Sequence, residues 1–523
     1  MHLKALYTYN TNQVFDDSNF ASPELAELIQ FAMWSSEPVP FDPMEVTLHQ
    51  VYQQTRADDQ RKDFQMVHEY PLEGKPPMMT HIFESGSGER IIAAKGAPEA
   101  ILAVCHLTKE KIEILHEKIR DLGRQGYRLL GVAKSHFEGK DLPEKQQDLP
   151  FEFLGFTIFY DPPKKGIREV FRKIYEAGIK VKVITGDNAN TTQAIAQQAG
   201  ITSSTPAVDG AQIIHHTQNE LVELSRETVL FTRMFPEAKL AMVNALKENG
   251  EVVAMIGDGV NDAPALKAAH VGVAMGTKGT EIAKAAASLV ITNDDLEKLI
   301  TGIAAGRRIY TNIKKAIQYI ISIHIPIILT VSLPLFLGWI YPHIFTPVHV
   351  IFLELIMGPT CSIVYENEPM EKNTMLQKPR KMTETFLNWN ELSMSIIQGL
   401  MITAGVLFAY QYSVQHGSNE QTTRAMVFTT LVFANVFLSL VNRSLVYSMI
   451  DSLHNKNRLF PLIIGITLAL LLAILYIPPV TEFFQVTRLN LKGIGICALI
   501  SAASVLWFEV FKWINQRKKR YGM

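Results

Sequence analysis

The chain has 523 residues, a length that suggests about three domains. Its 50 Lys and Arg residues against 51 Asp and Glu residues leave a formal net charge of −1, which excludes a global electrostatic attraction to nucleic acid. Hydrophobic residues make up 47% of the chain and charged residues 19%, so apolar and charged stretches must be segregated, and three cysteines exclude a disulfide framework.

Residues 1–155 predict a separate α+β domain. They combine a helical pattern (PELAELIQFAMW) with apolar extended segments (MMTHIFES, ERIIAAKGAPE and YRLLGVAK). Short apolar runs bounded by polar, Gly and Pro residues are typical of strands. We expect the domain to end close to the DLPEKQQDLP stretch at 141–150.

Residues 156–302 predict strands that alternate with helices. The segment 179–188 (IKVKVITGDN) is an apolar strand followed by a polar turn, and 250–266 (GEVVAMIGDGVNDAPAL) repeats the plan. Further short strands are expected at 271–275 and 288–292. This alternation indicates a parallel, doubly wound sheet, in which ligands bind at the carboxyl ends of the strands. Both Asp-bearing turns fall at such ends.

The remainder of the chain is predicted to cross a membrane six times. The first candidate span has no charged residue over 25 positions, enough at about 1.5 Å per residue to cross a hydrocarbon core of about 30 Å. The six candidates are 316–340, 347–365, 392–414, 425–441, 459–478 and 493–513. The second and fourth are the least regular, because they are short or interrupted by polar residues.

Basic residues are unevenly distributed around these spans. The segments on one side carry four, four, three and four Lys or Arg residues, and the loops on the other side carry none, one and two. Because basic residues concentrate on the cytoplasmic side, the pattern predicts a multi-pass protein of the cytoplasmic membrane. The large N-terminal part and both termini are then cytoplasmic, and the lipid bilayer is a partner.

Five motifs follow one another in the order of a known family: KGAPE (95–99), DPPKKGIREV (161–170), TGDN (185–188), RMFPEAK (233–239) and GDGVNDAPALKAAHVGVAMG (257–276). With the six spans they resemble the C-terminal part of P-type (E1-E2) cation-transporting ATPases, over nearly the whole chain. The resemblance implies an inserted-type α+β nucleotide-binding domain (1–155) and an α/β haloacid-dehalogenase-like, Rossmann-like phosphorylation domain (156–302). An all-α bundle of six transmembrane helices follows (303–523). ATP, Mg²⁺ and an inorganic cation are the implied ligands.

A magnesium and phosphate site is expected where the GDG turn ends its strand. A carboxylate between glycines can hold Mg²⁺ and leave coordination positions open to phosphate. By resemblance Asp258 is the Mg²⁺ ligand, and Asn261 and Asp262 surround the phosphate and the metal. Thr185 is expected to offer its hydroxyl to phosphate, and Lys239 resembles the lysine that neutralises transition-state charge.

The resemblance also implies contacts with the nucleotide. In the first domain these are Glu45 at the adenine amino group, Lys95 beside adenine, Gly96 for close backbone approach, and Arg128 at the phosphates. In the second domain they are Gly186, Asp187 (a nucleotide or hinge contact) and Arg233. One departure is visible, since Leu72 stands near the place of a family aromatic residue, which removes aromatic stacking on adenine.

Ionisable residues inside predicted spans are candidates for the cation path. Glu354 is the acid in the middle of the second span, with a structural or interfacial role as the alternative. His324, close to Pro326, is as consistent with a structural role as with a ligand. Asn435 in the fourth span could supply an oxygen, although helix packing is the favoured role. Calcium pumps of the family typically carry an Asp at the place of Gly358, so calcium is not assigned.

The family's nucleophilic aspartate lies in the motif DKTGT, which does not occur in the chain. The chain is therefore expected to be the C-terminal part of a pump, without the actuator domain and the first four spans, and inactive alone. The missing N-terminal half is an expected partner. The alternative is a truncated, non-catalytic membrane protein or regulator that binds nucleotide without turnover.

Overall fold

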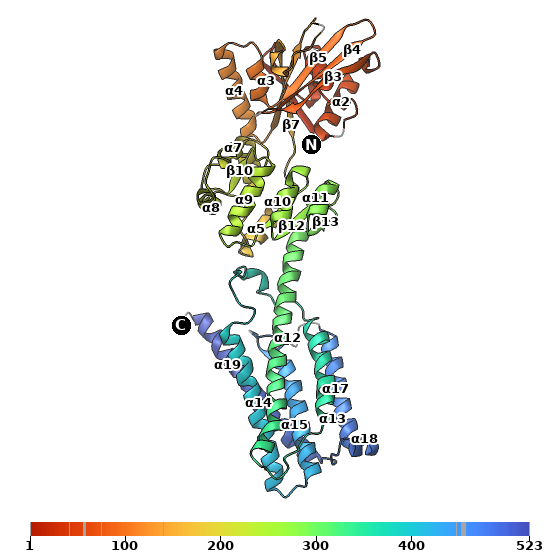
Figure 1. Ribbon diagram of the computed structural model, residues 1–523, viewed down its shortest axis with the longest axis vertical. Coiled ribbons are helices and arrows are strands. Elements are labelled where there is room, and N and C mark those ends of the chain that lie inside the picture. Colours follow the sequence, from red (N-terminus) through yellow and green to blue (C-terminus); the bar gives the residue numbers. More distant parts are fainter. Residues whose placement is uncertain are drawn as a thin grey trace. The chain divides into compact units, whose positions relative to one another are not determined.

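The computed structural model describes residues 2–40, 42–55, 59–74, 76–139, 141–445, 447–450 and 457–521. Lys456, one of the three basic residues counted after the fourth span, lies outside these ranges, as do the side chains of residues 361, 362 and 518–521. The chain divides into two compact units, Met1–Glu297 and Lys298–Met523. Figure 1 shows the elements of both units, coloured along the sequence.

The first unit begins with a seven-stranded antiparallel sheet of order β2-β1-β7-β6-β5-β4-β3. Its strands are β1 (His2–Thr8), β2 (Gln13–Asp16), β3 (Phe64–Glu73), β4 (Met78–Ser85), β5 (Arg90–Gly96), β6 (Arg128–Ser135) and β7 (Phe151–Tyr160). The three extended segments expected from the sequence are the strands β4, β5 and β6, which confirms that part of the prediction.

Helices cover both faces of this sheet. They are α1 (Ala26–Trp34) and α2 (Pro43–Thr55) on one face, and α3 (Pro98–Val104) and α4 (Lys109–Arg124) on the other (Figure 1). Successive side chains of a strand point to opposite faces. Accordingly Ile91 and Ala93 of β5 pack with the α1–α2 cluster, whereas Ile92 and Ala94 pack with the α3–α4 cluster. A strand buried on both faces is largely apolar, and β5 carries apolar side chains from Ile91 to Ala94.

Two small parallel sheets follow, of order β8-β10-β9 and β11-β12-β13. The strands are β8 (Val183–Ile184), β9 (Val208–Asp209), β10 (Leu230–Thr232), β11 (Ala254–Gly257), β12 (Val271–Met275) and β13 (Leu289–Ile291). The helices between them are α5 (Ile167–Glu176), α6 (Ala189–Gln198), α7 (Gly210–Ile213), α8 (Gln218–Glu227), α9 (Pro236–Glu248), α10 (Ala263–Ala268) and α11 (Glu281–Ala286). The alternation of strand and helix is confirmed.

The structure has these two sheets in place of the single parallel sheet that was predicted. The strands that carry the Asp-bearing turns, β8 and β11, each lie at one end of their own sheet among the described residues. Each therefore has one backbone edge without a strand partner, which leaves hydrogen-bonding groups available for pairing. The segment predicted as a strand over 179–188 is extended only at Val183–Ile184, because β10 pairs with it over two residues.

The second unit is helical. Its long helices are α12 (Glu297–Phe336, which begins at the last residue of the first unit), α13 (Pro347–Pro359) with the π-helical continuation η6 (Thr360–Tyr365), α14 (Trp389–Gln415), α15 (Glu420–Val441), α17 (Leu459–Tyr476) and α19 (Leu491–Tyr521). A short α18 (Pro478–Phe483) follows α17. Within the described residues, six helices are long and apolar enough to cross a membrane, which confirms the six predicted spans. Short 3₁₀ turns occur elsewhere in the chain: η1 (Asp17–Asn19), η2 (Pro23–Leu25), η3 (Gln60–Lys62), η4 (Gln146–Asp148), η5 (Val260–Asp262) and η7 (Thr374–Leu376).

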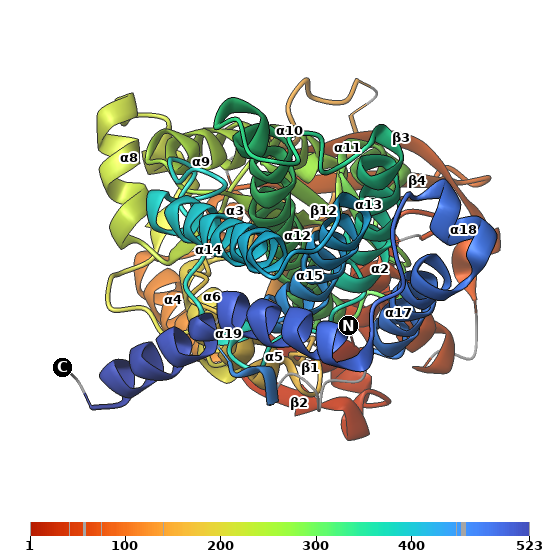
Figure 2. The same cartoon turned by 90° about the horizontal axis from the view of Figure 1, so that it is seen from below.

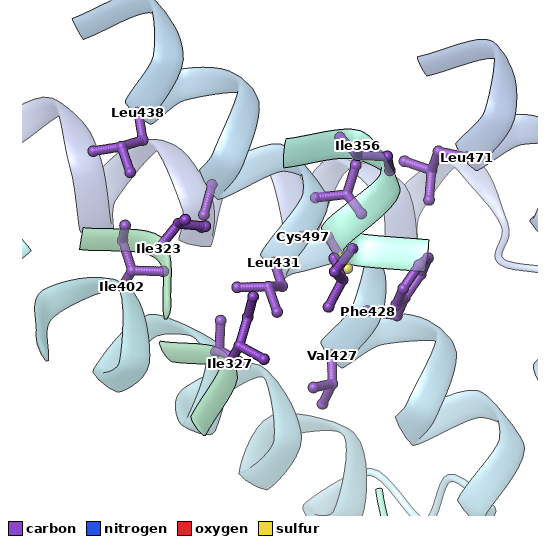
Figure 3. Close-up of a cluster of buried hydrophobic side chains, with 14 of the residues drawn as sticks. Ile323, Ile327, Ile356, Ile402, Val427, Phe428, Leu431, Leu438, Leu471 and Cys497 are labelled. Atoms are coloured by element: carbon purple, nitrogen blue, oxygen red, sulfur yellow. The ribbon is translucent and has the colours of Figure 1, made fainter. Parts of the chain in front are cut away.

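The central helix of this bundle is α15. In the most apolar 18-residue stretch of α15, 78% of the residues are buried inside the protein. The corresponding value is 28% for both α17 and α19. Figure 2 shows α15 surrounded by the other long helices. Figure 3 shows the core that results, with labelled side chains from all six: Ile323, Ile327, Ile356, Ile402, Val427, Phe428, Leu431, Leu438, Leu471 and Cys497. A helix enclosed by protein need not be uniformly apolar, which explains the polar interruptions in this span.

Candidate functional site

The turn after β11 holds the residues expected at the magnesium and phosphate site. Asp262 is buried, and its Oδ2 accepts hydrogen bonds from the backbone N–H groups of Asp258 and Gly259, both at 3.2 Å. Its Oδ1 lies 2.6 Å from Lys239 Nζ, on α9, which is also buried. A Cβ at Gly257 would lie 2.5 Å from Asp262 Cβ, so only glycine lets this carboxylate reach the turn. The structure thus brings Lys239, Asp258 and Asp262 together.

The two carboxylates of this turn differ in what they can bind. That of Asp262 is occupied by a lysine and two backbone donors, whereas the Asp258 side chain is exposed, and no hydrogen bond or ion pair to its carboxylate is found among the described residues. Mg²⁺ usually takes one or two protein carboxylates and keeps waters or phosphate oxygens. Asp258 therefore fits a Mg²⁺ ligand, and Asp262 fits a group that fixes the turn and Lys239. Asn261 is exposed beside them.

The turn after β8 forms a second polar loop, which carries Thr185, Gly186 and Asp187. Thr185 Oγ1 accepts a hydrogen bond from Asp187 N–H at 3.1 Å, and Asp187 O accepts from Arg233 N–H at 2.9 Å. Arg233 has a φ of 48°, a left-handed conformation uncommon for a side chain of this size. Such conformations cluster at functional sites. The TGDN and RMFPEAK motifs thus form one loop pair.

Two ion pairs connect this loop pair to the elements of the seven-stranded sheet. Arg128 at the start of β6 lies 2.7 Å from Asp187, and Arg233 lies 2.9 Å from Glu99 of α3. An open pocket of about 560 Å³ adjoins the second ion pair, and its lining includes Glu99, Arg120 and Arg233. Both ion pairs therefore involve residues that were expected to contact the nucleotide: Arg128, Asp187 and Arg233.

Glu45 and Lys95 form a buried ion pair on the α1–α2 face of the sheet. Lys95 Nζ lies 2.5 Å from Glu45 Oε1 and 2.9 Å from Ser36 Oγ, and the three residues are 6%, 7% and 1% exposed. Burial lowers the pKa of Lys95, and its hydrogen bond to Glu45 opposes that effect. Glu45 Oε2 is buried with no partner among the described atoms. An acceptor without a donor is what an adenine amino group would satisfy, so the pair fits a nucleotide.

Two further positions in this domain have structural explanations. A Cβ at Gly96 would lie 2.6 Å from both Met78 Cα and Pro77 O, so glycine is required for the approach of β5 to the start of β4. The close approach that Gly96 permits in this structure is therefore to the chain itself. Leu72 on β3 is 60% exposed, which leaves it available to an outside ligand.

In the second unit, the two strongest cation candidates lie against each other. His324 Nε2 of α12 is 3.2 Å from Glu354 Oε1 of α13, and the two side chains are 39% and 49% exposed. His324 Nδ1–H donates to Ile320 O at 2.8 Å, which fixes the ring. The π-helical segment η6 begins shortly after Glu354, and π-helical turns are frequent at functional sites.

Asn435 lies apart from this pair. It is 3% exposed, its Oδ1 accepts a hydrogen bond from the Tyr319 hydroxyl, and its Nδ2 has no partner among the described atoms. Because a cation requires oxygen ligands and the amide oxygen is already bonded, this environment favours the packing role over the cation role.

Sequence reasoning missed the partners of several of these residues. His324 and Glu354 were found as separate candidates, and nothing in either span showed that they face each other across two helices. Glu69 and His81 were not among the predicted site residues. Their hairpin contained a usable signal, since two strands joined by a short turn pair about a midpoint, and Glu69 pairs with His81 in the register of β3 and β4.

Comparisons with known proteins agree with this arrangement. A family model described as haloacid dehalogenase-like hydrolase matches residues 51–270, and one described as the C-terminus of cation transporting ATPases matches residues 342–514. A calcium-transporting ATPase of Bacillus subtilis is 30% identical over 447 residues, which are 82% of this chain and 49% of that protein. Calcium-transporting ATPase 1 of Bacillus cereus is 29% identical over 512 residues, 92% of this chain and 57% of that protein. Human calcium-transporting ATPase type 2C member 1 is 27% identical over 478 residues, which are 88% of this chain and 51% of that protein.

The fold and site define a haloacid-dehalogenase-like α/β region joined in one chain to six membrane-spanning helices. The resemblance drawn from the motifs is confirmed: the chain corresponds to the C-terminal part of P-type cation-transporting ATPases. It spans about half the length of the curated relatives it matches.

Proposed function

We propose that the chain supplies the nucleotide site, the magnesium and phosphate site, and part of the membrane cation path of an ATP-driven cation pump. The observation that carries the proposal is the turn after β11. There Asp262 fixes Lys239 at 2.6 Å and leaves the exposed carboxylate of Asp258 for Mg²⁺. When bound, Mg²⁺ would neutralise phosphate charge, which is the main requirement of phosphoryl transfer. We propose nucleotide binding by 1–155, phosphate binding by 156–302 and cation passage by 303–523.

For the transported ion we propose an inorganic cation and assign no particular element. The relatives described above are named calcium-transporting ATPases. In this chain the expected place of a second acid in α13 is Gly358, which offers no side-chain oxygen. Glu354 with His324 provides one carboxylate and one imidazole instead, a ligand set that does not select calcium.

A second candidate function is favoured by one observation. The 523 residues contain no DKTGT, so a protein of this sequence alone would bind nucleotide without forming a phosphorylated intermediate. It would then act as a non-catalytic membrane protein or regulator. The reading frame upstream of the coding sequence separates the two candidates, because DKTGT and further spans there favour the pump.

We predict that both termini lie in the cytoplasm, with the six helices crossing the cytoplasmic membrane. The reason is the excess of basic residues on alternate sides of the helices, four, four, three and four against none, one and two. Reporter fusions after Phe345 and after Tyr521 should report opposite sides of the membrane. The same side for both would contradict the topology.

We predict that the Glu45–Lys95 pair is required for ATP binding. Replacing both members together (Glu45→Gln with Lys95→Met) avoids an uncompensated buried charge, so the fold should be retained. Loss of hydrogen bonds to charged groups should weaken ATP affinity roughly 10- to 100-fold. Displacement of a fluorescent ATP analogue from the purified chain measures this.

The matched control for that experiment is another lysine–glutamate pair of the same domain. Lys134 and Glu27 are 2.7 Å apart but half-exposed, and the variant Lys134→Met with Glu27→Gln should bind ATP as the parent chain does. Equal affinity of the Glu45–Lys95 variant and this control would remove the nucleotide site from the proposal.

A further inference from the structure

Three side chains that the proposed nucleotide site does not use gather on the α1–α2 face of the large sheet. Glu69 of β3 and His81 of β4 are directly paired across the two strands, and Glu37 follows α1. One possible ligand atom from each lies within 4.8 Å of the others. Among the described residues, no other group of three His, Cys, Asp or Glu side chains satisfies that condition.

The ring of His81 is held in the form that can bind a metal. Its Nδ1 lies 3.1 Å from Ser36 O, and because a carbonyl oxygen only accepts, Nδ1 carries the proton. Nε2 is therefore a lone-pair acceptor, and it is buried without a partner in a residue that is 0% exposed. A histidine that binds a metal through one nitrogen usually donates its other N–H to a carbonyl or carboxylate in this way.

The electrostatic surroundings also favour a cation. Burial lowers the pKa of His81, and this outweighs the opposing effect of Glu37 and Glu69, which favours the neutral ring. The cation among the groups acting on His81 is Lys95, which is already paired with Glu45. Neither Glu37 nor Glu69 takes part in an ion pair among the described residues. Two carboxylates and an imidazole thus face one another, and the positive charge that acts on them, Lys95, is already paired with Glu45.

The donor set indicates the class of metal. One imidazole nitrogen and two carboxylate oxygens suit zinc and its first-row neighbours, whereas Mg²⁺ and Ca²⁺ prefer oxygen alone. Tetrahedral zinc with bonds of about 2.0–2.1 Å places its ligand atoms about 3.4 Å apart. The ligand atoms already lie within 4.8 Å of one another, and the two glutamates have room to move closer because Glu69 is exposed and Glu37 partly so.

We propose that Glu37, Glu69 and His81 form a binding site for a divalent transition-metal ion of the zinc class, with the remaining coordination position open to water. The site fastens the end of α1 to the β3–β4 hairpin. Ser36 connects it to the neighbouring ion pair, since its carbonyl holds His81 and its hydroxyl accepts from Lys95. The proposal stands whether or not that ion pair binds nucleotide.

The test is zinc binding by the full chain, purified in detergent, stripped of metal and titrated with Zn²⁺ alone against a chromophoric chelator. The parent chain should bind a zinc equivalent that the variant Glu37→Gln with Glu69→Gln binds at least about tenfold more weakly. Zinc should raise the thermal midpoint of the parent chain, as any ligand specific to the folded state does, and should not raise that of the variant. Both replaced residues are at least partly solvent-exposed, so the variant should fold. Replacing the buried ligand, as in His81→Gln, risks unfolding the domain. The double glutamate variant tests the site without that risk.

Two controls separate this site from other metal-binding groups. His68→Asn with Glu73→Gln changes a histidine and a glutamate that are exposed on the same strand β3 but lie outside the cluster, and zinc affinity should be unchanged. Asp258→Asn, on the magnesium turn, should also retain this zinc equivalent. Unaltered zinc affinity in the Glu37–Glu69 variant, or the same loss in either control, would overturn the proposal.

Discussion

Membranes that contain only this 523-residue chain are expected to form no acid-stable, hydroxylamine-sensitive phosphoenzyme from γ-³²P-ATP. Covalent phosphoryl transfer in the family begins with attack by an aspartate, and DKTGT is absent from the sequence. Of the two carboxylates on the magnesium turn, Asp262 is bonded to Lys239 and two backbone N–H groups, and Asp258 is the proposed metal ligand. Without a nucleophile, only the weak acceleration from positioning and charge remains.

A P-type pump that carries DKTGT, expressed and labelled in the same way, is the positive control. A labelled band at the mass of this chain, lost when Mg²⁺ is chelated, would show that another carboxylate has become the acceptor. Asp258→Asn and Asp262→Asn would then identify which one. Membranes that contain this chain alone should also show no cation-stimulated release of phosphate from ATP.

The geometry of the two small sheets is consistent with this expectation. β8 and β11 carry Thr185 and Asp258 at their carboxyl ends, and each has an unpaired edge among the described residues. In a doubly wound sheet, side chains at adjacent strand ends converge on one ligand. A strand that paired with both edges would bring the two turns to one sheet and could carry an acceptor at its own end. The pairing would also cover backbone groups that are now without strand partners.

The fold was largely predictable because its main signals are local. The apolar extended segments that form β4, β5 and β6 and the strand–turn–helix pattern around Asp258 depend on neighbouring residues, and both are found in the structure. The extent of β8 was not predictable, since only two residues find a partner in β10. A strand's length depends on what pairs with it, which a single segment does not show.

Contacts between segments that are far apart in the sequence were the main features that could not be predicted. Lys315 and Arg443 entered the orientation argument as loop charges, but they are 2% and 3% exposed and pair with Glu371 and Glu368. Burial of such charges requires partners, and those partners stand more than fifty residues away in each case. The orientation thus remains a prediction that the reporter fusions test.

The same limitation applies to the cation path, where sequence identified Glu354 but not its neighbour. A mid-membrane carboxylate costs about 3 kcal/mol or more unless something pairs with it or uses it. The structure supplies His324 at 3.2 Å. Because Nδ1–H donates to Ile320 O, the nitrogen that faces Glu354 is the one that can hold a cation together with the carboxylate.

We therefore predict that Glu354→Gln abolishes cation-stimulated turnover in a pump in which this chain is completed by a DKTGT-bearing half. The prediction rests on the proposed function. Glutamine keeps the shape of the side chain but removes the charge that offsets a cation's lost hydration, so ion dependence should disappear while ATP affinity stays unchanged. His324→Asn should reduce the apparent cation affinity. Glu366→Gln, an exposed acid at the end of η6, is the matched control and should behave as the parent does. Normal ion dependence in Glu354→Gln would refute the assignment, and loss of ATP binding as well would show misfolding of the variant rather than a missing ligand.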